Sequence, residues 1–249
     1  MPVSNGSAFN IECTDISGWT DGDTGEAVSS QVTFDGKSCF KFDTVTSADT
    51  NDSTIRSLDF GSVEAIGNNL VVSLSVYCDA IGTQANSDFF RFKVERSDWR
   101  FDVRFCSDGL FIHDGAAYNE VGTNIVVQDV WQEWTFDIDL SAGVASANCD
   151  VYLNNVLKAS NFDCSATGIY GDGYLEFRQY GYGANNRISY VDWLKIGDAF
   201  EGEATTTTSS TTSSSTSSSS TSSSTSTQAL QAAVQQALQK ERHLIEVML

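Results

Sequence analysis

Basic residues are scarce in this chain, and their scarcity excludes whole classes of function. The 249 residues include 14 lysines and arginines against 33 aspartates and glutamates, which gives a formal net charge of −19. Proteins that bind nucleic acids or anionic membranes need clustered lysine and arginine to meet phosphate groups. We therefore expect no nucleic-acid partner. Long apolar runs are also missing, since no stretch reaches the ~18 residues that a membrane span needs.

Histidine is scarce too, occurring only as His113 and His243, and there is no Cys-x-x-Cys pair. Both shortages argue against zinc, whose protein sites combine such ligands at short spacing. An even number of cysteines without zinc partners favours disulfides formed in an oxidising compartment, with buried free thiols as the alternative. The six cysteines are Cys13, Cys39, Cys78, Cys106, Cys149 and Cys164.

The N-terminal sequence MPVSNGSAFN lacks the apolar segment of a signal peptide. A removed leader and a cytosolic location would each explain this. Two Asn-x-Ser sequons, at Asn5 and Asn51, agree with secretion and with N-glycosylation. Together with the cysteines, they predict an extracellular protein.

Proline is absent after Pro2, so no predicted strand lacks a backbone N–H donor. Before residue 205, apolar and polar residues alternate with period two, and turn signals such as Asp35-Gly36 and Asn154-Asn155 separate the runs. About ten to twelve short strands at this spacing predict an all-β fold, an antiparallel β-sandwich or jelly roll. The predicted strands are Gln31–Phe34, Ser38–Phe42, Leu70–Cys78, Asp88–Glu95, Arg100–Cys106, Gly109–His113, Trp134–Leu140, Asp150–Leu153, Tyr174–Tyr180 and Ile188–Ile196.

The order of these strands suggests which cysteines meet, among the fifteen pairings that six cysteines allow. If consecutive strands pair, the three strands between residues 70 and 106 run up, down and up, so their two cysteines lie at one edge of the sheet. Two other cysteines flank the hairpin that turns at Asn154-Asn155. The resulting hypothesis pairs Cys78 with Cys106, Cys149 with Cys164, and Cys13 with Cys39.

Three runs near the end of this region carry a family resemblance: WQEWTFDIDL, CDVYLNNVLKAS and YLEFRQYGYGANNRISYVDWLKIG. In this order they resemble the second half of a concanavalin A-like or laminin-G-like jelly roll. The opening ISGWTDGD and FDGKSCFKFDT are similar to carbohydrate-binding jelly rolls. The resemblance covers roughly residues 9 to 198 and implies the fold. It implies no single function, because the superfamily includes lectins, glucanases, adhesion modules and structural domains.

Glucanases of this fold carry alternating catalytic carboxylates on one strand face. The nearest match is Asp137-Ile-Asp139, where glutamates are missing and Thr135 precedes the pair. A β-glucanase is therefore the least favoured function, and we expect no enzyme activity. His113 has no Ser/His/Asp set around it and is expected to be structural or exposed.

The resemblance also implies a structural Ca²⁺ as the one candidate cofactor. Asp192 matches the closing-strand aspartate that binds Ca²⁺ in some related modules, and Asp21 and Asp23 offer further hard oxygen ligands. The alternative is that Asp192 caps a turn or forms an ion pair.

Large aromatic residues offer stacking surfaces for pyranose rings. The alternative is that they fill the core of the sandwich. The candidates are Tyr170, Tyr174, Tyr180, Tyr182, Trp99 and Trp131.

Residues 205–227 are twenty-three consecutive serines and threonines that divide the chain. Such a tract cannot fold by burying apolar surface. We predict three parts: a jelly-roll sandwich over 1–204, a glycosylated linker over 205–227, and an assembly helix over 228–249. A bare flexible linker is the alternative for the tract. The predicted O-glycosylated threonines are Thr205, Thr206, Thr207, Thr208, Thr211, Thr212, Thr216, Thr221, Thr225 and Thr227.

The last twenty-two residues predict an amphipathic helix, about 33 Å long and marginal in isolation. Its apolar stripe needs a partner, either a second copy of the chain or its own sandwich domain. The sequence therefore favours a secreted, non-enzymatic subunit that self-assembles into an oligomer or an extracellular filament. A multivalent carbohydrate-binding lectin or adhesion module is the alternative. The stripe consists of Leu230, Val234, Leu238, Ile245 and Leu249.

Overall fold

The computed structural model describes residues 9–25, 27–44, 53–59, 69–86, 89–168, 170, 173–181 and 186–197. The Ser/Thr tract, the predicted C-terminal helix and both sequons lie outside the described residues, so glycosylation and helix-mediated assembly stay predictions. No helix in the described part of the chain is long and apolar enough to cross a membrane.

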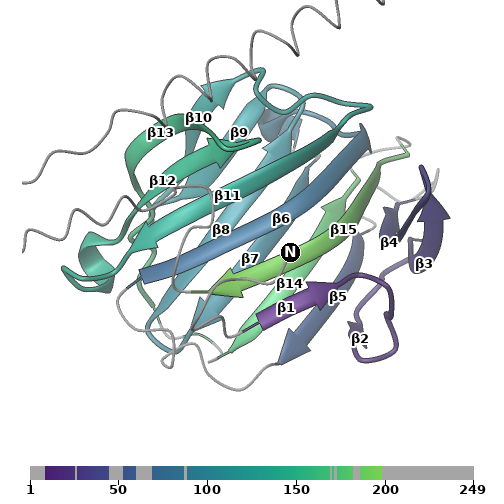
Figure 1. Cartoon of the computed structure of the whole chain (residues 1–249), viewed down its shortest axis with the longest axis horizontal. Helices are drawn as coiled ribbons and strands as arrows, with labels where there is room; N and C mark the ends of the chain where they lie inside the picture. Colours follow the sequence, from purple (N-terminus) through teal and green to yellow (C-terminus); the bar gives the residue numbers. More distant parts are fainter. Residues whose placement is uncertain are drawn as a thin grey trace, which may run out of the picture. The chain divides into compact units, whose positions relative to one another are not determined.

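The described residues form two antiparallel sheets that lie one over the other (Figure 1). The eight-stranded sheet has the order β13-β12-β11-β6-β15-β4-β3, with β1 also beside β15. The seven-stranded sheet has the order β10-β9-β8-β7-β14-β5-β2. The all-β sandwich expected from the sequence is confirmed.

The strands of the eight-stranded sheet are β1 (Phe9–Glu12), β3 (Val28–Phe34), β4 (Lys37–Asp43), β6 (Asn69–Ala80), β11 (Trp131–Asp139), β12 (Asn148–Leu153), β13 (Val156–Asp163) and β15 (Ile188–Gly197). Those of the seven-stranded sheet are β2 (Thr20–Asp21), β5 (Ser53–Asp59), β7 (Phe90–Arg96), β8 (Trp99–Cys106), β9 (Gly109–His113), β10 (Tyr118–Thr123) and β14 (Tyr174–Tyr180). Two short 3-10 turns, Gln84–Asn86 and Val144–Ser146, complete the elements.

Period-two alternation sends every second side chain into the space between the sheets, where apolar burial stabilises the sandwich. Aromatic rings from opposite sheets meet there: Phe101 lies 5.0 Å from Phe136, and Phe105 lies 5.7 Å from Trp134, between ring centroids. All four side chains are fully buried. The other side of each strand faces away from this core.

Two hairpins confirm their predicted turns. Asp35 and Gly36 have φ values of 51° and 75°, and Asn154 and Asn155 have values of 50° and 63°. Positive φ at both central residues is what a two-residue type I′ turn requires, and Asp, Asn and Gly tolerate it best.

The predicted up-down-up meander is wrong at its first step. Strand β6 pairs with β11 and β15 in the eight-stranded sheet, whereas β7 and β8 pair with each other in the seven-stranded sheet. Nine residues separate the end of β6 from the start of β7. A connection of that length exceeds the two to five residues of a hairpin loop and can cross between layers.

All six cysteines lie within the described residues, where they are buried and recorded as free thiols, so the expected disulfides stay a prediction. The predicted partners nevertheless lie near one another. Cys149 and Cys164 flank the β12–β13 hairpin, and a hydrogen bond between their thiols is the largest cause that raises the pKa of Cys149.

Cys13 and Cys39 meet beside one residue of β15. The Cys13 amide donates to the Asp192 carbonyl at 3.0 Å, and the strand pairing that sets Phe40 opposite Val191 brings Cys39 to the same place. Burial is the largest cause that raises the pKa of Cys13, and Cys39 adds a smaller contribution.

Cys78 and Cys106 lie on different sheets. Burial chiefly raises the pKa of Cys106, and Cys78 also contributes. Their nearest polar contacts differ, because Cys106 Sγ lies 3.6 Å from the Gln84 amide oxygen, whereas Cys78 interacts with Ser189.

Candidate functional site

The three central strands of the seven-stranded sheet turn a band of charged side chains away from the core. Strands β8, β7 and β14 lie side by side, and their alternate residues on the outer side are mostly ionised. We call this band the charged face. It consists of Arg91, Lys93 and Glu95 on β7, Arg100, Asp102 and Arg104 on β8, and Glu176 and Arg178 on β14.

Strand register arranges these residues in three rows across the sheet. The first row is Arg104–Arg91–Arg178, the second is Asp102–Lys93–Glu176, and the third is Arg100–Glu95–Tyr174. Directly opposite residues in antiparallel strands have Cβ atoms about 4.5–5.5 Å apart, so members of a row interact.

Several of these charges are largely withdrawn from water. Asp102 is 0% exposed, Glu176 6%, Lys93 8% and Glu95 9%. Charged side chains are rarely buried to this extent unless they are paired. The four arginines of the face are half-buried, so part of each side chain stays in contact with water.

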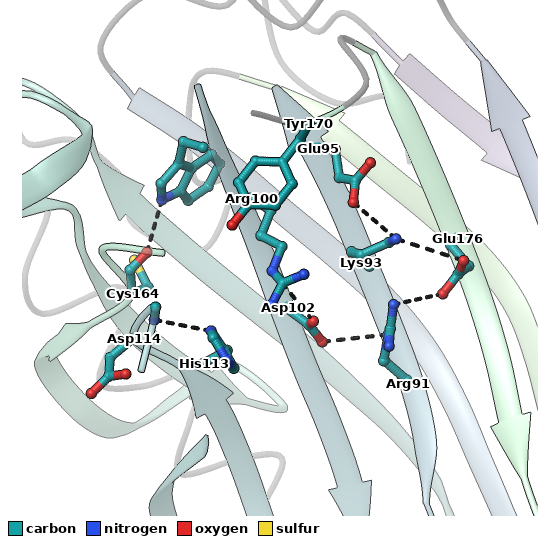
Figure 2. Close-up of polar contacts among 12 residues, drawn as sticks. Arg91, Lys93, Glu95, Arg100, Asp102, His113, Asp114, Cys164, Tyr170 and Glu176 are labelled. Atoms are coloured by element: carbon teal, nitrogen blue, oxygen red, sulfur yellow. Dashed lines mark hydrogen bonds and ion pairs between the residues drawn. The ribbon is translucent and has the colours of Figure 1, made fainter. Parts of the chain in front are cut away.

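Ion pairs link the rows (Figure 2). The Arg91 guanidinium contacts Glu176 at 2.8 Å, and the Lys93 ammonium contacts Glu95 at 2.9 Å and Glu176 at 3.6 Å. Burial opposes the charge of Arg91, but Asp102 and Glu176 outweigh it and raise the pKa of Arg91.

Asp102 is held more loosely than its burial would suggest. Its carboxylate reaches Arg91 Nε at 3.5 Å and Arg100 Nε at 3.7 Å, which are ion-pair distances longer than a good hydrogen bond. Neither carboxylate oxygen meets good hydrogen-bond geometry with a described residue, although the Tyr118 hydroxyl lies close enough to interact with the carboxylate. The side-chain Nε atoms of Arg91, Arg100 and Arg104 are likewise buried without a well-formed hydrogen bond among the described residues.

Aromatic rings border the charged face. Each of the following cations lies over a ring, as cation–π pairs do. The cation-to-centroid distances are 5.2 Å for Arg100 over Tyr170, 4.9 Å for Lys93 over Tyr174, 3.9 Å for Arg178 over Tyr180, and 3.4 Å for Arg104 over Tyr118. Figure 2 shows the Tyr170 ring beside Arg100. The four tyrosines are half-buried.

A small apolar cluster lies beside the arginine row. Phe89, Cys106 and Phe111 are buried there, and Tyr118 and Tyr180 pack against them. The face thus combines hydrogen-bonding groups with an apolar surface, the usual make-up of a small-molecule site.

His113 lies next to the face without a base-like arrangement. Its Nδ1 accepts a hydrogen bond from the Gly115 amide at 2.9 Å, and its ring meets Tyr118 edge-on at 4.7 Å. Burial, followed by the charge of Arg100, lowers the pKa of His113. The pKa of Tyr118 is raised, chiefly by burial and then by Asp102.

Three of the aromatic residues suggested for sugar stacking gather at the charged face, namely Tyr170, Tyr174 and Tyr180. Trp99 instead fills the core, where its indole N–H donates to the Cys164 carbonyl at 2.8 Å. Trp131 lies on the outer side of the other sheet, 5.5 Å from Tyr77. Tyr182 lies outside the described residues.

The proposed calcium ligands do not converge. Asp192 is the extra residue of a bulge in β15 and pairs with Lys37 at 2.6 Å. Asp21 and Asp23 contact Arg56 at 3.2 Å and 3.8 Å. No group of three His, Cys, Asp or Glu residues placed to hold a metal occurs in the described ranges.

The Asp137-Ile-Asp139 pair lies on β11, in the opposite layer from the charged face. The Asp139 carboxylate accepts a hydrogen bond from the Ser141 amide at 2.7 Å, so it caps the turn after the strand.

The charged residues of the face were missed at the sequence level. Their signal is present in RFKVER and RFDVR, where charged and apolar residues alternate strictly. Alternation shows that these side chains share one side of a strand. It does not show that strands at residues 90, 100 and 176 lie together.

No protein-family model matches the chain, and no curated protein sequence matches it. Solved structures do match. A structure of botulinum neurotoxin type C, whose cell entry depends on interaction with two ganglioside molecules, aligns with TM-score 0.50 and 12% identity over 79% of this chain and 49% of that chain. The binding domain of botulinum neurotoxin DC, solved in complex with rat synaptotagmin II, aligns with TM-score 0.49 and 13% identity over 78% and 48%.

The cellulose induced protein Cip1 aligns with TM-score 0.48 and 9% identity, over 77% of this chain and 97% of that chain. This chain spans about half the length of the neurotoxin chains that it matches. At these identities, the likeness concerns the β-sandwich fold alone.

Proposed function

We propose that this protein binds carbohydrate on the charged face of its seven-stranded sheet. The observation that carries the proposal is the border of half-buried tyrosines, Tyr170, Tyr174, Tyr180 and Tyr118, around a band of hydrogen-bonding side chains. A pyranose ring has an apolar face that packs on an aromatic ring, and hydroxyl groups that exchange hydrogen bonds with charged side chains.

Loose polar contacts support the same proposal. The Asp102 carboxylate and three arginine Nε atoms are buried without well-formed hydrogen bonds among the described residues. Buried polar groups normally find partners, and sites in free proteins often tighten only when the ligand arrives. Hydroxyl groups of a sugar can both donate to Asp102 and accept from the arginines.

We propose binding without cleavage. A glycosidase needs two carboxyl groups across the scissile bond, one of which delivers a proton to the leaving oxygen. The three carboxylates of the charged face are all engaged with cations, at 2.8–3.7 Å. Release of reducing ends from a bound polysaccharide would contradict this part of the proposal.

Self-assembly through the C-terminal helix rests on residues outside the described range. Carbohydrate binding therefore takes precedence as the proposed function, with the helix as a means of making binding multivalent. An extracellular location and three disulfides remain part of the proposal, because two of the three predicted cysteine pairs are neighbours and the third pair interacts electrostatically.

Binding to a panel of neutral and acidic polysaccharides, measured by affinity electrophoresis and calorimetry, tests the proposal. We expect Tyr170→Ala and Tyr174→Ala each to weaken binding about tenfold or more, as central aromatic contacts do. Tyr152→Ala is the matched control, since Tyr152 is a half-buried tyrosine on β12 of the other sheet. Equal losses in all three variants, or no binding by the unmodified protein, would refute carbohydrate binding at this face.

A further inference from the structure

The arginine row is the least expected feature of the charged face. Arg104, Arg91 and Arg178 lie directly opposite one another on three adjacent strands. Like charges in directly opposite positions destabilise a sheet. The row continues to Phe111 on β9 and then Glu120 on β10 at one end, and to Ile55 on β5 at the other, so no counter-charge lies directly beside the arginines within the row.

The carboxylates of the neighbouring row neutralise the arginines only in part. Arg91 pairs closely with Glu176, but its contact with Asp102 is 3.5 Å. Arg104 stacks between the rings of Phe89 and Tyr118, at 3.9 Å and 3.4 Å from their centroids. Burial lowers the pKa of Arg178; Tyr180 and Glu176 offset part of that shift, and the neighbouring Arg91 adds to it.

The net charge of the face contrasts with that of the chain. Five cations and three carboxylates leave it with +2, whereas the whole chain carries −19. Glu120, which is exposed on β10 opposite Phe111, lies at the rim of the same side. Positive charge gathered in one place on an acidic protein attracts anions there and repels them elsewhere.

Stability does not explain this arrangement. Buried ion pairs are often no more stabilising than apolar side chains of similar size, because desolvation offsets their attraction. A row of half-buried arginines adds repulsion to that cost. A bound anion would supply the counter-charge that the row of arginines lacks, and so would account for the arrangement.

Building on the proposed function, we propose that the arginine row binds the anionic group of an acidic saccharide, a carboxylate or a sulfate. Guanidinium groups are planar and hold such anions through two parallel hydrogen bonds. Tyr118 and Tyr180 pack beside the two ends of the row, so the sugar ring that carries the anion rests on an aromatic surface.

The experiment compares polygalacturonate, glucuronan and alginate as carboxylated ligands, dextran sulfate and a sulfated galactan as sulfated ligands, and dextran, mannan and β-glucan as neutral ones. We expect tight binding only to acidic members. Raising NaCl from about 0.1 M to 1 M should weaken that binding more than tenfold, because the Debye length shortens from ~10 Å to ~3 Å. Comparison of the carboxylated and sulfated arms identifies which anion the row accepts.

Arg178→Gln and Arg104→Gln, each verified as folded by thermal unfolding, should weaken binding of the acidic ligand about tenfold or more. Arg178→Lys keeps the charge but loses the planar donor pair, so its affinity for the acidic ligand should lie between those of the unmodified protein and Arg178→Gln. Lys158→Gln is the control, because it removes one positive charge from an exposed position on β13.

The outcomes separate the two proposals. Binding to neutral polysaccharides only, or equal losses in the arginine variants and the Lys158 control, would overturn the acidic ligand and leave carbohydrate binding intact. Failure of every ligand to bind would overturn both proposals.

Discussion

Reducing the proposed bond between Cys149 and Cys164 should lower the free energy of unfolding by about 3 kcal/mol. A disulfide stabilises mainly by restricting the unfolded chain, and this one would close a loop of about 15 residues. The folded state needs little adjustment, since the two thiols are already hydrogen-bonded neighbours at the open end of the β12–β13 hairpin.

Urea unfolding with and without a reducing agent measures the effect. With a denaturant slope of about 1–3 kcal/mol/M, loss of this bond moves the midpoint down by roughly 1–3 M. The other two pairs also respond to reductant. A variant with both Cys149 and Cys164 replaced by alanine isolates this pair. Reductant should lower its free energy of unfolding by about 3 kcal/mol less than it lowers that of the unmodified protein.

The stability of the protein at alkaline pH gives an independent test of whether the cysteines form disulfides. In the reduced protein, burial raises the pKa of Cys78 from its ordinary 9.0 to about 12 and that of Cys39 to about 11. The unfolded thiols ionise near their ordinary value while the folded ones stay neutral, so reduced protein loses stability as the pH rises from 9 toward 12. Disulfide-bonded protein has no such loss from its cysteines.

Alkylation of the unreduced protein tests the three disulfides directly. If all six cysteines react with iodoacetamide in denaturant without prior reduction, and reductant leaves the urea midpoint unchanged, the cysteines are free thiols in the native protein.

Two further predictions concern the stability of the seven-stranded sheet. Asp102→Ala should lower the free energy of unfolding by about 3–5 kcal/mol, because it removes the ion-pair partner of the buried Arg100 Nε and leaves Arg91 with Glu176 alone. A loss below about 1 kcal/mol by chemical denaturation would contradict this role of the carboxylate. Gly109→Ala should also destabilise, since its added Cβ would lie 2.7 Å from the backbone oxygen of Gly122, whereas Gly18→Ala, where nothing lies within 4 Å, should unfold at the same temperature as the unmodified protein.

Sequence patterns predicted the strands that have one buried side and a clear turn at their ends. The bounds of β9 and β14 agree with their predictions, because Asp108-Gly109 and Asp172-Gly173 mark where they begin. No range was predicted for β1, β2 or β5. The same is true of β10 and β13, although the hairpin predicted at Asn154-Asn155 implies a strand in the place of β13. Most residues of these last two strands are exposed, so no apolar alternation marks them.

The candidate site was predictable only in part, for a related reason. Tyr170, Tyr174 and Tyr180 were named because large aromatic side chains signal stacking wherever they occur. Alternation assigns a side chain to one side of its strand but does not say which strands are neighbours, so the arginine row stayed hidden. The same limit placed β6 beside β7 rather than beside β15.

The position of the last two described strands governs the order in which the molecule can fold. Strand β14 lies between β7 and β5, and β15 lies between β6 and the pair β4 and β1, so each sheet is joined through its middle by a late segment. Until residues 174–197 have been synthesised, both sheets remain in two pieces with unpaired edges. Contacts between strands far apart in the sequence form slowly, so folding is slow. Meanwhile the unpaired strand edges can pair with other chains. A chain that stops before residue 174 should therefore aggregate rather than form a smaller sandwich.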